Sequence, residues 1–148
     1  MKKLALVVIL FTLTHLLVSC APKGDSTRIL PQITELHGQW VVINYWAKWC
    51  KPCIKEIPEL NELNRKYSQV TVLGVNYDGV TGKELAKQVE TLGIDFAILP
   101  EDPAASLTLS RPVVLPTTVI LKPSGEISQT LIGPQTATSL AKATRQTP

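Results

Sequence analysis

Two cysteines separated by two residues lie between a strand-like run and a helix-like run, and this arrangement constrains the fold more than any other feature. Cys50 and Cys53 follow the apolar residues 40–46 and precede residues 54–67, whose apolar side chains recur at helical spacing. We expect Cys50 at the exposed N-terminus of the helix and Cys53 one turn inside it, facing inward. A helix N-terminus carries partial positive charge and favours a thiolate. The pair therefore predicts thiol–disulfide exchange, with Cys50 as the nucleophile.

Half of a zinc site is the alternative for this pair. Zinc usually takes four ligands, and the chain offers few others, because it has three cysteines and two histidines in all. Cys20 and His15 lie near the N-terminus, and His37 stands alone. A disulfide across two residues closes too small a loop to stabilise the fold much. The sequence therefore favours a redox pair, and we expect neither a metal nor another cofactor.

The N-terminal residues predict export. Lys2 and Lys3 precede the apolar residues 4–17, a stretch shorter than the roughly 20 residues that a membrane-spanning helix needs. An uncleaved anchor helix is the alternative, and it would also carry the rest of the chain across the membrane.

Residues 17–20, Leu-Val-Ser-Cys, resemble the bacterial lipobox, in which a cysteine is lipidated and becomes the first mature residue. The resemblance implies a lipoprotein signal peptide over residues 1–19 and a lipid on Cys20. The small and polar residues that follow predict a tether over residues 20–28. Ala21, rather than an aspartate, follows the cysteine, which in the usual bacterial sorting pattern favours the outer membrane.

The remaining residues, 29–148, are long enough for one domain. Of the 15 Lys and Arg residues, Lys2 and Lys3 lie in the predicted signal peptide, which leaves 13 against 12 Asp and Glu. This near-neutral balance, without a basic run, indicates no nucleic-acid partner. We also expect the domain to be a monomer.

The pattern of apolar runs predicts an α/β fold. Strands are expected at residues 40–46, 70–76, 96–99, 117–121 and 127–132, and helices at residues 54–67, 81–93, from 102 onward and 135–145. The early alternation of strands and helices implies parallel pairing, and the late hairpin adds antiparallel strands. Thr81 and Glu84 have the spacing of a capping box, and Asp102 is expected to cap a short helix. The predicted architecture is a mixed central sheet with helices on both faces.

Three motifs resemble the thioredoxin fold over about residues 29–146. Residues 46–53, Trp-Ala-Lys-Trp-Cys-Lys-Pro-Cys, match its active-site run. Pro58 matches the proline that kinks its helix, and residues 115–117, Leu-Pro-Thr, match the loop whose proline is cis in that fold.

Within this superfamily, the chain is most similar to the exported, membrane-anchored TlpA/ResA-like thiol-disulfide oxidoreductases. Asn44 stands where plain thioredoxin has a buried aspartate. Residues 72–78, followed by a helix, resemble the strand and helix inserted in that branch, and Glu56 matches a glutamate that those proteins hold near the site.

The resemblance implies roles for residues around the cysteines. Pro116 would be cis, and the backbone of Leu115 would pair with the substrate chain like an added strand; a proline that merely starts the next strand is the alternative. If Glu56 is partly buried, its pKa should rise and it would then move a proton on or off Cys53, whereas its spacing alone indicates an ordinary surface carboxylate. Trp49 would be a partly exposed lid beside the nucleophile that contacts the substrate protein.

By resemblance, the chain is an exported thiol-disulfide oxidoreductase, anchored by lipid in a bacterial membrane and facing the periplasm or the cell exterior. Its expected partners are disulfide-containing exported proteins, which it would reduce with electrons from a membrane thiol donor. Cytochrome c maturation is the leading role at the level of the family. A disulfide oxidant or isomerase is the alternative within the same chemistry. A non-catalytic module that handles copper or haem is the alternative from another class, although the chain offers no methionine cluster as soft ligands.

Overall fold

Five strands and four helical segments follow one another in the computed structural model, which describes residues 33–147. In chain order they are the 3-10 helix η2 (Ile33–Leu36), β1 (Trp40–Trp46), α1 (Lys51–Lys66), β2 (Val70–Asn76), α2 (Gly82–Leu92), β3 (Ala97–Ile98), β4 (Thr117–Leu121), β5 (Ile127–Ile132) and α3 (Ala137–Ala143). Four of the strands have the predicted bounds, and β3 is shorter than predicted. Within this part of the chain, the helices are too short or too polar to cross a membrane.

The strands form one mixed sheet in the order β3-β2-β1-β4-β5. β1 is parallel to β2, and β2 to β3, whereas β4 is antiparallel to both of its neighbours, β1 and β5. In this register Tyr45 pairs with Val75 on one side and with Thr117 on the other. The carboxyl ends of β1 and β2 and the amino end of β4 therefore lie at the same end of the sheet. The two-cysteine segment after β1 begins at that end, and the loop before Thr117 ends there.

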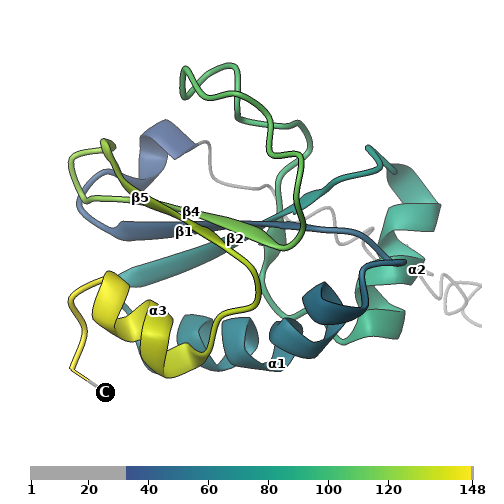
Figure 1. Ribbon diagram of the computed structural model, residues 1–148, viewed down its shortest axis with the longest axis horizontal. Helices are drawn as coiled ribbons and strands as arrows, with labels where there is room; N and C mark the ends of the chain where they lie inside the picture. Colours follow the sequence, from purple (N-terminus) through teal and green to yellow (C-terminus); the bar gives the residue numbers. More distant parts are fainter. Residues whose placement is uncertain (1–32, 148) are drawn as a thin grey trace, which may run out of the picture.

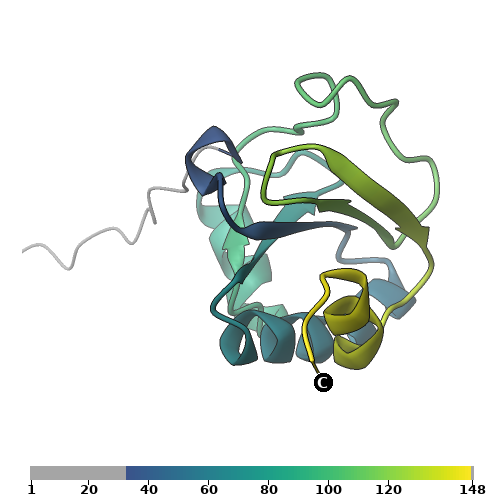
Figure 2. The same ribbon diagram turned by 90° about the vertical axis from the view of Figure 1, so that its left-hand side faces the viewer.

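The two faces of the sheet are covered differently. Figure 1 and Figure 2 show α1 and α3 side by side beneath the sheet, with α2 beside its β3 edge. These three helices share one apolar cluster with sheet residues such as Val42 and Ile120. The opposite face, around Ile43 and Val119, is covered by η2 and by the long segment between β3 and β4. The predicted α/β class with a mixed sheet is confirmed, but among residues 33–147 the second face is covered by a short 3-10 helix and a loop.

The prediction of a short helix starting at Asp102 is wrong. Asp102 does accept the backbone N–H of Ala104 at 3.0 Å, as a capping residue would, and the Leu107 N–H donates to the Pro103 carbonyl at 3.0 Å. The chain then reaches Thr108, whose φ of 55° lies in the left-handed region. A residue in that conformation cannot continue a right-handed helix, so the segment forms turns instead.

The bounds of α2 agree with the prediction, but its capping box does not form. Thr81 is the N-cap residue, with extended backbone, and its side chain makes no capping hydrogen bond. Glu84 instead forms an ion pair with Lys48 at 3.8 Å and accepts the side-chain N–H of Gln88 at 3.2 Å. At its other end the helix stops at Gly93, which takes a φ of 66° that suits glycine.

Candidate active site

The two cysteines form a disulfide at the start of α1. The helix begins at Lys51, earlier than the predicted residue 54, so Cys50 is its N-cap residue. The Cys50 Sγ accepts the backbone N–H of Cys53 at 3.2 Å, as a capping side chain does. The Cα atoms of the two cysteines are 5.3 Å apart, and Cys53 faces inward as predicted, with 1% of its surface exposed.

Cys50 is not exposed, which corrects the prediction. Only 4% of its surface is accessible, and it belongs to the same apolar cluster as Trp46 and Ala47. Lys51, which lies between the two cysteines, is exposed.

The start of α1 determines what the sulfur pair can do. The first backbone N–H groups of a helix lack partners within it, and its dipole favours negative charge there. Once the disulfide is reduced, both effects stabilise a thiolate on Cys50, toward which the Cys53 N–H already points. A stabilised thiolate with a second thiol within bonding distance can exchange disulfides with another molecule.

Glu56 lies one turn beyond Cys53 and is buried, with 1% of its surface exposed. Its Oε1 accepts the backbone N–H of Gln135 at 2.9 Å, and its Oε2 accepts the side-chain N–H of Asn44 at 3.2 Å. Burial raises the pKa of Glu56 from 4.5 to about 7, although the two hydrogen bonds oppose the rise. The burial on which the functional interpretation of Glu56 depended is observed, the interpretation as a surface carboxylate is wrong, and the role of Glu56 in proton transfer stays a prediction. A carboxyl that titrates near neutrality can give or take a proton under physiological conditions.

Asn44 completes the buried polar group beneath the cysteines. It is 1% exposed, and its Nδ2 also donates to the Thr118 Oγ1 at 3.0 Å. Asn44 therefore joins β1, α1 and β4 through side-chain bonds. An amide side chain does not titrate near neutral pH, so in this buried group only Glu56 can take up or release a proton there.

The loop before β4 has the geometry that the resemblance implied. The peptide bond between Leu115 and Pro116 is cis. Pro116 is buried, and its carbonyl accepts the backbone N–H of Gly133 at 2.9 Å, while the Thr117 Oγ1 donates to the Val114 carbonyl at 2.7 Å. Leu115 is half-buried and packs against the apolar clusters on both faces of the sheet. The prediction of a cis proline is thus confirmed, and the pairing of Leu115 with a substrate stays a prediction.

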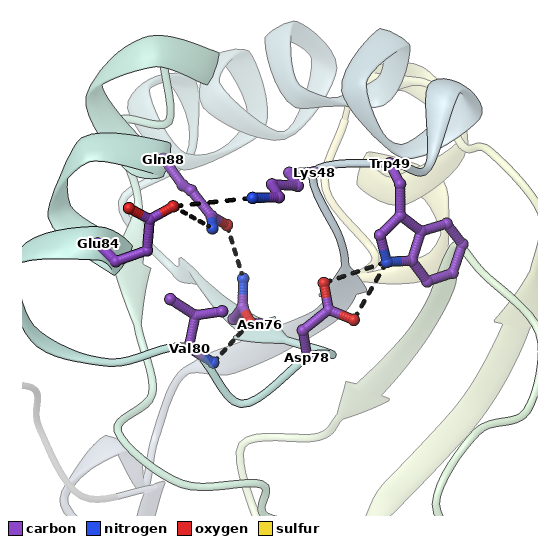
Figure 3. A network of polar contacts seen from close by, with 7 residues as sticks. All are labelled: Lys48, Trp49, Asn76, Asp78, Val80, Glu84 and Gln88. Carbon is purple, nitrogen blue, oxygen red and sulfur yellow. Dashed lines mark hydrogen bonds and ion pairs between the residues drawn. The ribbon is translucent and has the colours of Figure 1, made fainter.

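Trp49 directly precedes Cys50 and is 60% exposed. Its indole Nε1–H donates to the carboxylate of Asp78, which follows β2, and Nε1 lies 3.1 Å from each carboxylate oxygen (Figure 3). Asp78 was not among the predicted site residues. A signal was available, because Trp49 and Asp78 follow adjacent parallel strands, whose carboxyl ends meet at one end of the sheet.

Cys20, the predicted lipidation site, lies outside the described residues. Within residues 33–147 no group of three or more His, Cys, Asp or Glu side chains is arranged to hold a metal ion.

Comparisons with known proteins agree with this geometry. The AhpC/TSA family matches residues 20–130. The thiol-disulfide oxidoreductase ResA of Geobacillus kaustophilus is 31% identical over 116 residues, which cover 77% of this chain and 64% of the relative, so the chain spans slightly less than two thirds of that protein. Among solved structures, StoA from Bacillus subtilis is 26% identical with a TM-score of 0.60, and the match covers 72% of this chain and 83% of StoA. A secreted thiol-disulfide isomerase from Corynebacterium glutamicum is 25% identical with a TM-score of 0.65, covering 76% of this chain and 72% of that one. These similarities confirm the predicted thioredoxin-like fold and the resemblance to ResA-type proteins.

Proposed function

The chain belongs to the AhpC/TSA family within the thioredoxin superfamily, and we propose that it is a thiol-disulfide oxidoreductase that reduces disulfides in other exported proteins. One observation carries the proposal: a cysteine pair at the N-terminus of α1 with a buried carboxyl, Glu56, one turn beyond it. The pair supplies the electrons, and the carboxyl, with a pKa of about 7, can give or take a proton near neutral pH.

The proposed reaction takes two disulfide exchanges. The Cys50 thiolate attacks one sulfur of the substrate disulfide and forms a mixed disulfide, and the other substrate sulfur leaves as a thiolate that takes up a proton. Cys53 then gives its proton to Glu56, and its sulfur attacks that of Cys50. This step expels the second substrate sulfur as a thiolate, which takes up a proton, and it closes the Cys50–Cys53 disulfide. Two electrons have passed to the substrate, and a membrane thiol donor returns the protein to the dithiol.

The substrate chain would lie between Trp49 and the loop that ends at Pro116. The register of Tyr45 with Thr117 supports this arrangement, because it brings that loop to the end of β1, from which the cysteine segment begins. The backbone of Leu115 would pair with the substrate as an added strand. The exposed ring of Trp49 would contact the substrate from the other side.

Export and anchoring complete the proposal. The lipobox-like run before Cys20 supports a lipid anchor, with the outer membrane favoured by Ala21 and the domain facing the periplasm. In such a compartment the substrates are exported proteins with disulfides, and the cysteines that must be reduced during cytochrome c maturation are the leading example. Mass spectrometry of the mature N-terminus tests the lipid, and mixed disulfides trapped by Cys53→Ser in the native host identify the substrates.

A disulfide oxidant or isomerase is the second candidate, and the likeness to a secreted thiol-disulfide isomerase favours it. The reduction potential of the Cys50–Cys53 pair separates the two. A value of about −270 mV supports a reductant, and a value of about −120 mV supports an oxidant.

Reduction of insulin disulfides by the full-length chain tests the proposal. Cys50→Ser should abolish the activity, because it removes the attacking sulfur. Cys53→Ser should trap mixed disulfides, because the second exchange cannot occur. Cys20→Ser is the matched control, since it removes the remaining cysteine outside the pair and should leave insulin reduction intact. Full activity in the Cys50→Ser protein would overturn the proposal.

A further inference from the structure

We propose that Asp78 is a positioning residue that fixes the ring of Trp49 for binding of protein substrates. This inference rests on the proposed role of Trp49 as a substrate contact. Because Trp49 is 60% exposed, packing in the core does not fix its ring. The two contacts of its Nε1–H with the Asp78 carboxylate, each 3.1 Å, join residues 29 positions apart in the chain (Figure 3). They hold the indole by its polar edge and leave its faces to other groups.

Asp78 itself lies on a turn that buried side chains hold in place. Asn76, at the end of β2, accepts the backbone N–H of Val80 through its Oδ1 at 3.0 Å. Its Nδ2 donates to the Oε1 of Gln88 on α2 at 3.2 Å. Asn76 and Gln88 are only 7% and 6% exposed, so water competes little with these bonds. The turn that carries Asp78 is therefore braced from β2 and from α2.

The loop that carries Trp49 is bound to the same segment at two further points. The Tyr77 N–H donates to the Trp46 carbonyl at 2.8 Å, which extends the pairing of β1 and β2 to the residue before Asp78. Lys48 forms its ion pair with Glu84, on the first turn of α2. These contacts align the two backbones, and the bonds to Asp78 orient the ring.

A fixed indole lowers the cost of binding a protein chain. Side chains that are ordered before binding lose less conformational freedom when the partner arrives. Tryptophan is also among the residues that contribute most at protein interfaces, through its large apolar faces. Because Asp78 acts through the Trp49 ring, its loss should change KM for a protein disulfide more than it changes kcat.

Asp78→Ala in the full-length chain tests the inference, with insulin as the substrate. We expect KM to rise about three- to tenfold, which corresponds to about 0.6–1.4 kcal/mol, with a smaller change in kcat. Asp78→Asn keeps an oxygen that accepts the indole N–H and should restore most of the wild-type KM. Glu90→Ala is the matched control, because it removes another exposed carboxylate from the neighbouring α2 and should leave KM unchanged.

A double-mutant cycle separates positioning from direct contact with the substrate. In the Trp49→Ala protein, adding Asp78→Ala should raise KM little further. By nuclear magnetic resonance, Asp78→Ala should shift the indole N–H signal of Trp49 and speed its exchange with water. The inference is overturned by an unchanged KM in a protein whose wild type reduces insulin, by an unchanged indole signal, or by an effect that persists in Trp49→Ala. A wild-type chain that fails to reduce insulin would defeat the proposed function instead, and the indole signal would still test the contact.

Discussion

The two sides of the active-site end of the sheet differ in how far they are buried. On the buried side, Cys50, Cys53 and Glu56 are 4%, 1% and 1% exposed. On the exposed side, Trp49 is 60% exposed and its partner Asp78 lies in solvent. A low dielectric shifts pKa values and strengthens polar contacts, whereas solvent screens charge and leaves surfaces accessible. The buried side is therefore suited to moving electrons and protons, and the exposed side to contacting a partner.

The two sides also differ in how the chain assembles them. The buried side draws its three groups from the N-cap and first turns of one helix, so their spacing follows from the helix itself. The exposed side joins a loop after β1 to a turn after β2. A change on the buried side should therefore alter chemistry and stability together, and a change on the exposed side should alter binding with little cost to the fold.

Glu56→Gln should have the largest effect, which is on how the free energy of unfolding depends on pH. It removes the buried carboxyl whose pKa is raised. The pKa of Glu56 is about 7 in the fold against 4.5 ordinarily, so between these pH values the unfolded chain loses a proton that the folded chain keeps. The free energy of unfolding of the wild type should therefore fall as pH rises from 4.5 to about 7, and level off above that. The total fall is about 3 kcal/mol, at 1.36 kcal/mol for each pH unit. Glu56→Gln should lack it.

Urea denaturation of the oxidised proteins at several pH values measures this difference. Glu62→Gln is the matched control, since it changes an exposed glutamate on the same helix and should keep the wild-type slope. In turnover, Glu56→Gln should also slow the second exchange by about 10²-fold and remove the inflection near neutral pH. An unaltered dependence of stability on pH in Glu56→Gln would contradict the assignment of the shifted group.

Gly74→Ala tests the packing beneath the buried side. A Cβ at this position would lie 2.6 Å from the Ile98 Cδ1 and 3.0 Å from both the Phe96 Cε2 and the Trp46 Nε1. Overpacking of this kind typically costs about 1–3 kcal/mol, so the free energy of unfolding in urea should fall by that amount. Ile98→Val removes the nearest atom, and the double variant should be more stable than the sum of the two single costs implies. Strictly additive costs would show that the crowding lies elsewhere.

The sequence predicts the buried side better than the exposed side. β1 and β2 have the predicted bounds because long apolar, β-branched runs buried on both faces leave few alternatives. The closeness of Cys50 to Cys53 follows from their spacing. The burial of Glu56 does not follow from spacing, because it depends on Gln135 and Asn44, which come from other elements.

Two of the failures, at Thr81 and at Asp78, have a common physical cause, which is contact between distant segments. Local spacing indicates a capping box at Thr81, but Glu84 is engaged by Lys48 from another loop. The bond of Trp49 to Asp78 depends on where the turn after β2 places a carboxylate, and no periodicity in the chain carries that information. Propensity and patterning therefore locate the elements, whereas the contacts between loops require the assembled sheet.

The ion pair between Lys48 and Glu84 should contribute least, although it lies beside Trp49. The Nζ and Oε1 atoms are 3.8 Å apart, and the two side chains are 58% and 56% exposed. Pairs of this kind contribute about 0.2–1 kcal/mol, and salt screens them. Lys48→Gln should therefore lower the free energy of unfolding by less than about 0.5 kcal/mol, and about 1 M salt should remove the difference.

Lys87→Gln is the control for Lys48→Gln, because it removes an exposed positive charge from α2. Equal, small effects of the two variants in urea would mean that the exposed side is held by the bonds of Asp78 to Trp49 and by the buried pair of Asn76 and Gln88. A loss above about 1 kcal/mol for Lys48→Gln alone would exceed the range for an isolated surface pair. It would mean that Glu84, which also accepts a hydrogen bond from Gln88, couples the ion pair energetically to the buried bond between Gln88 and Asn76. In that case the contrast between a buried side that supports the fold and an exposed side whose changes cost it little would no longer stand.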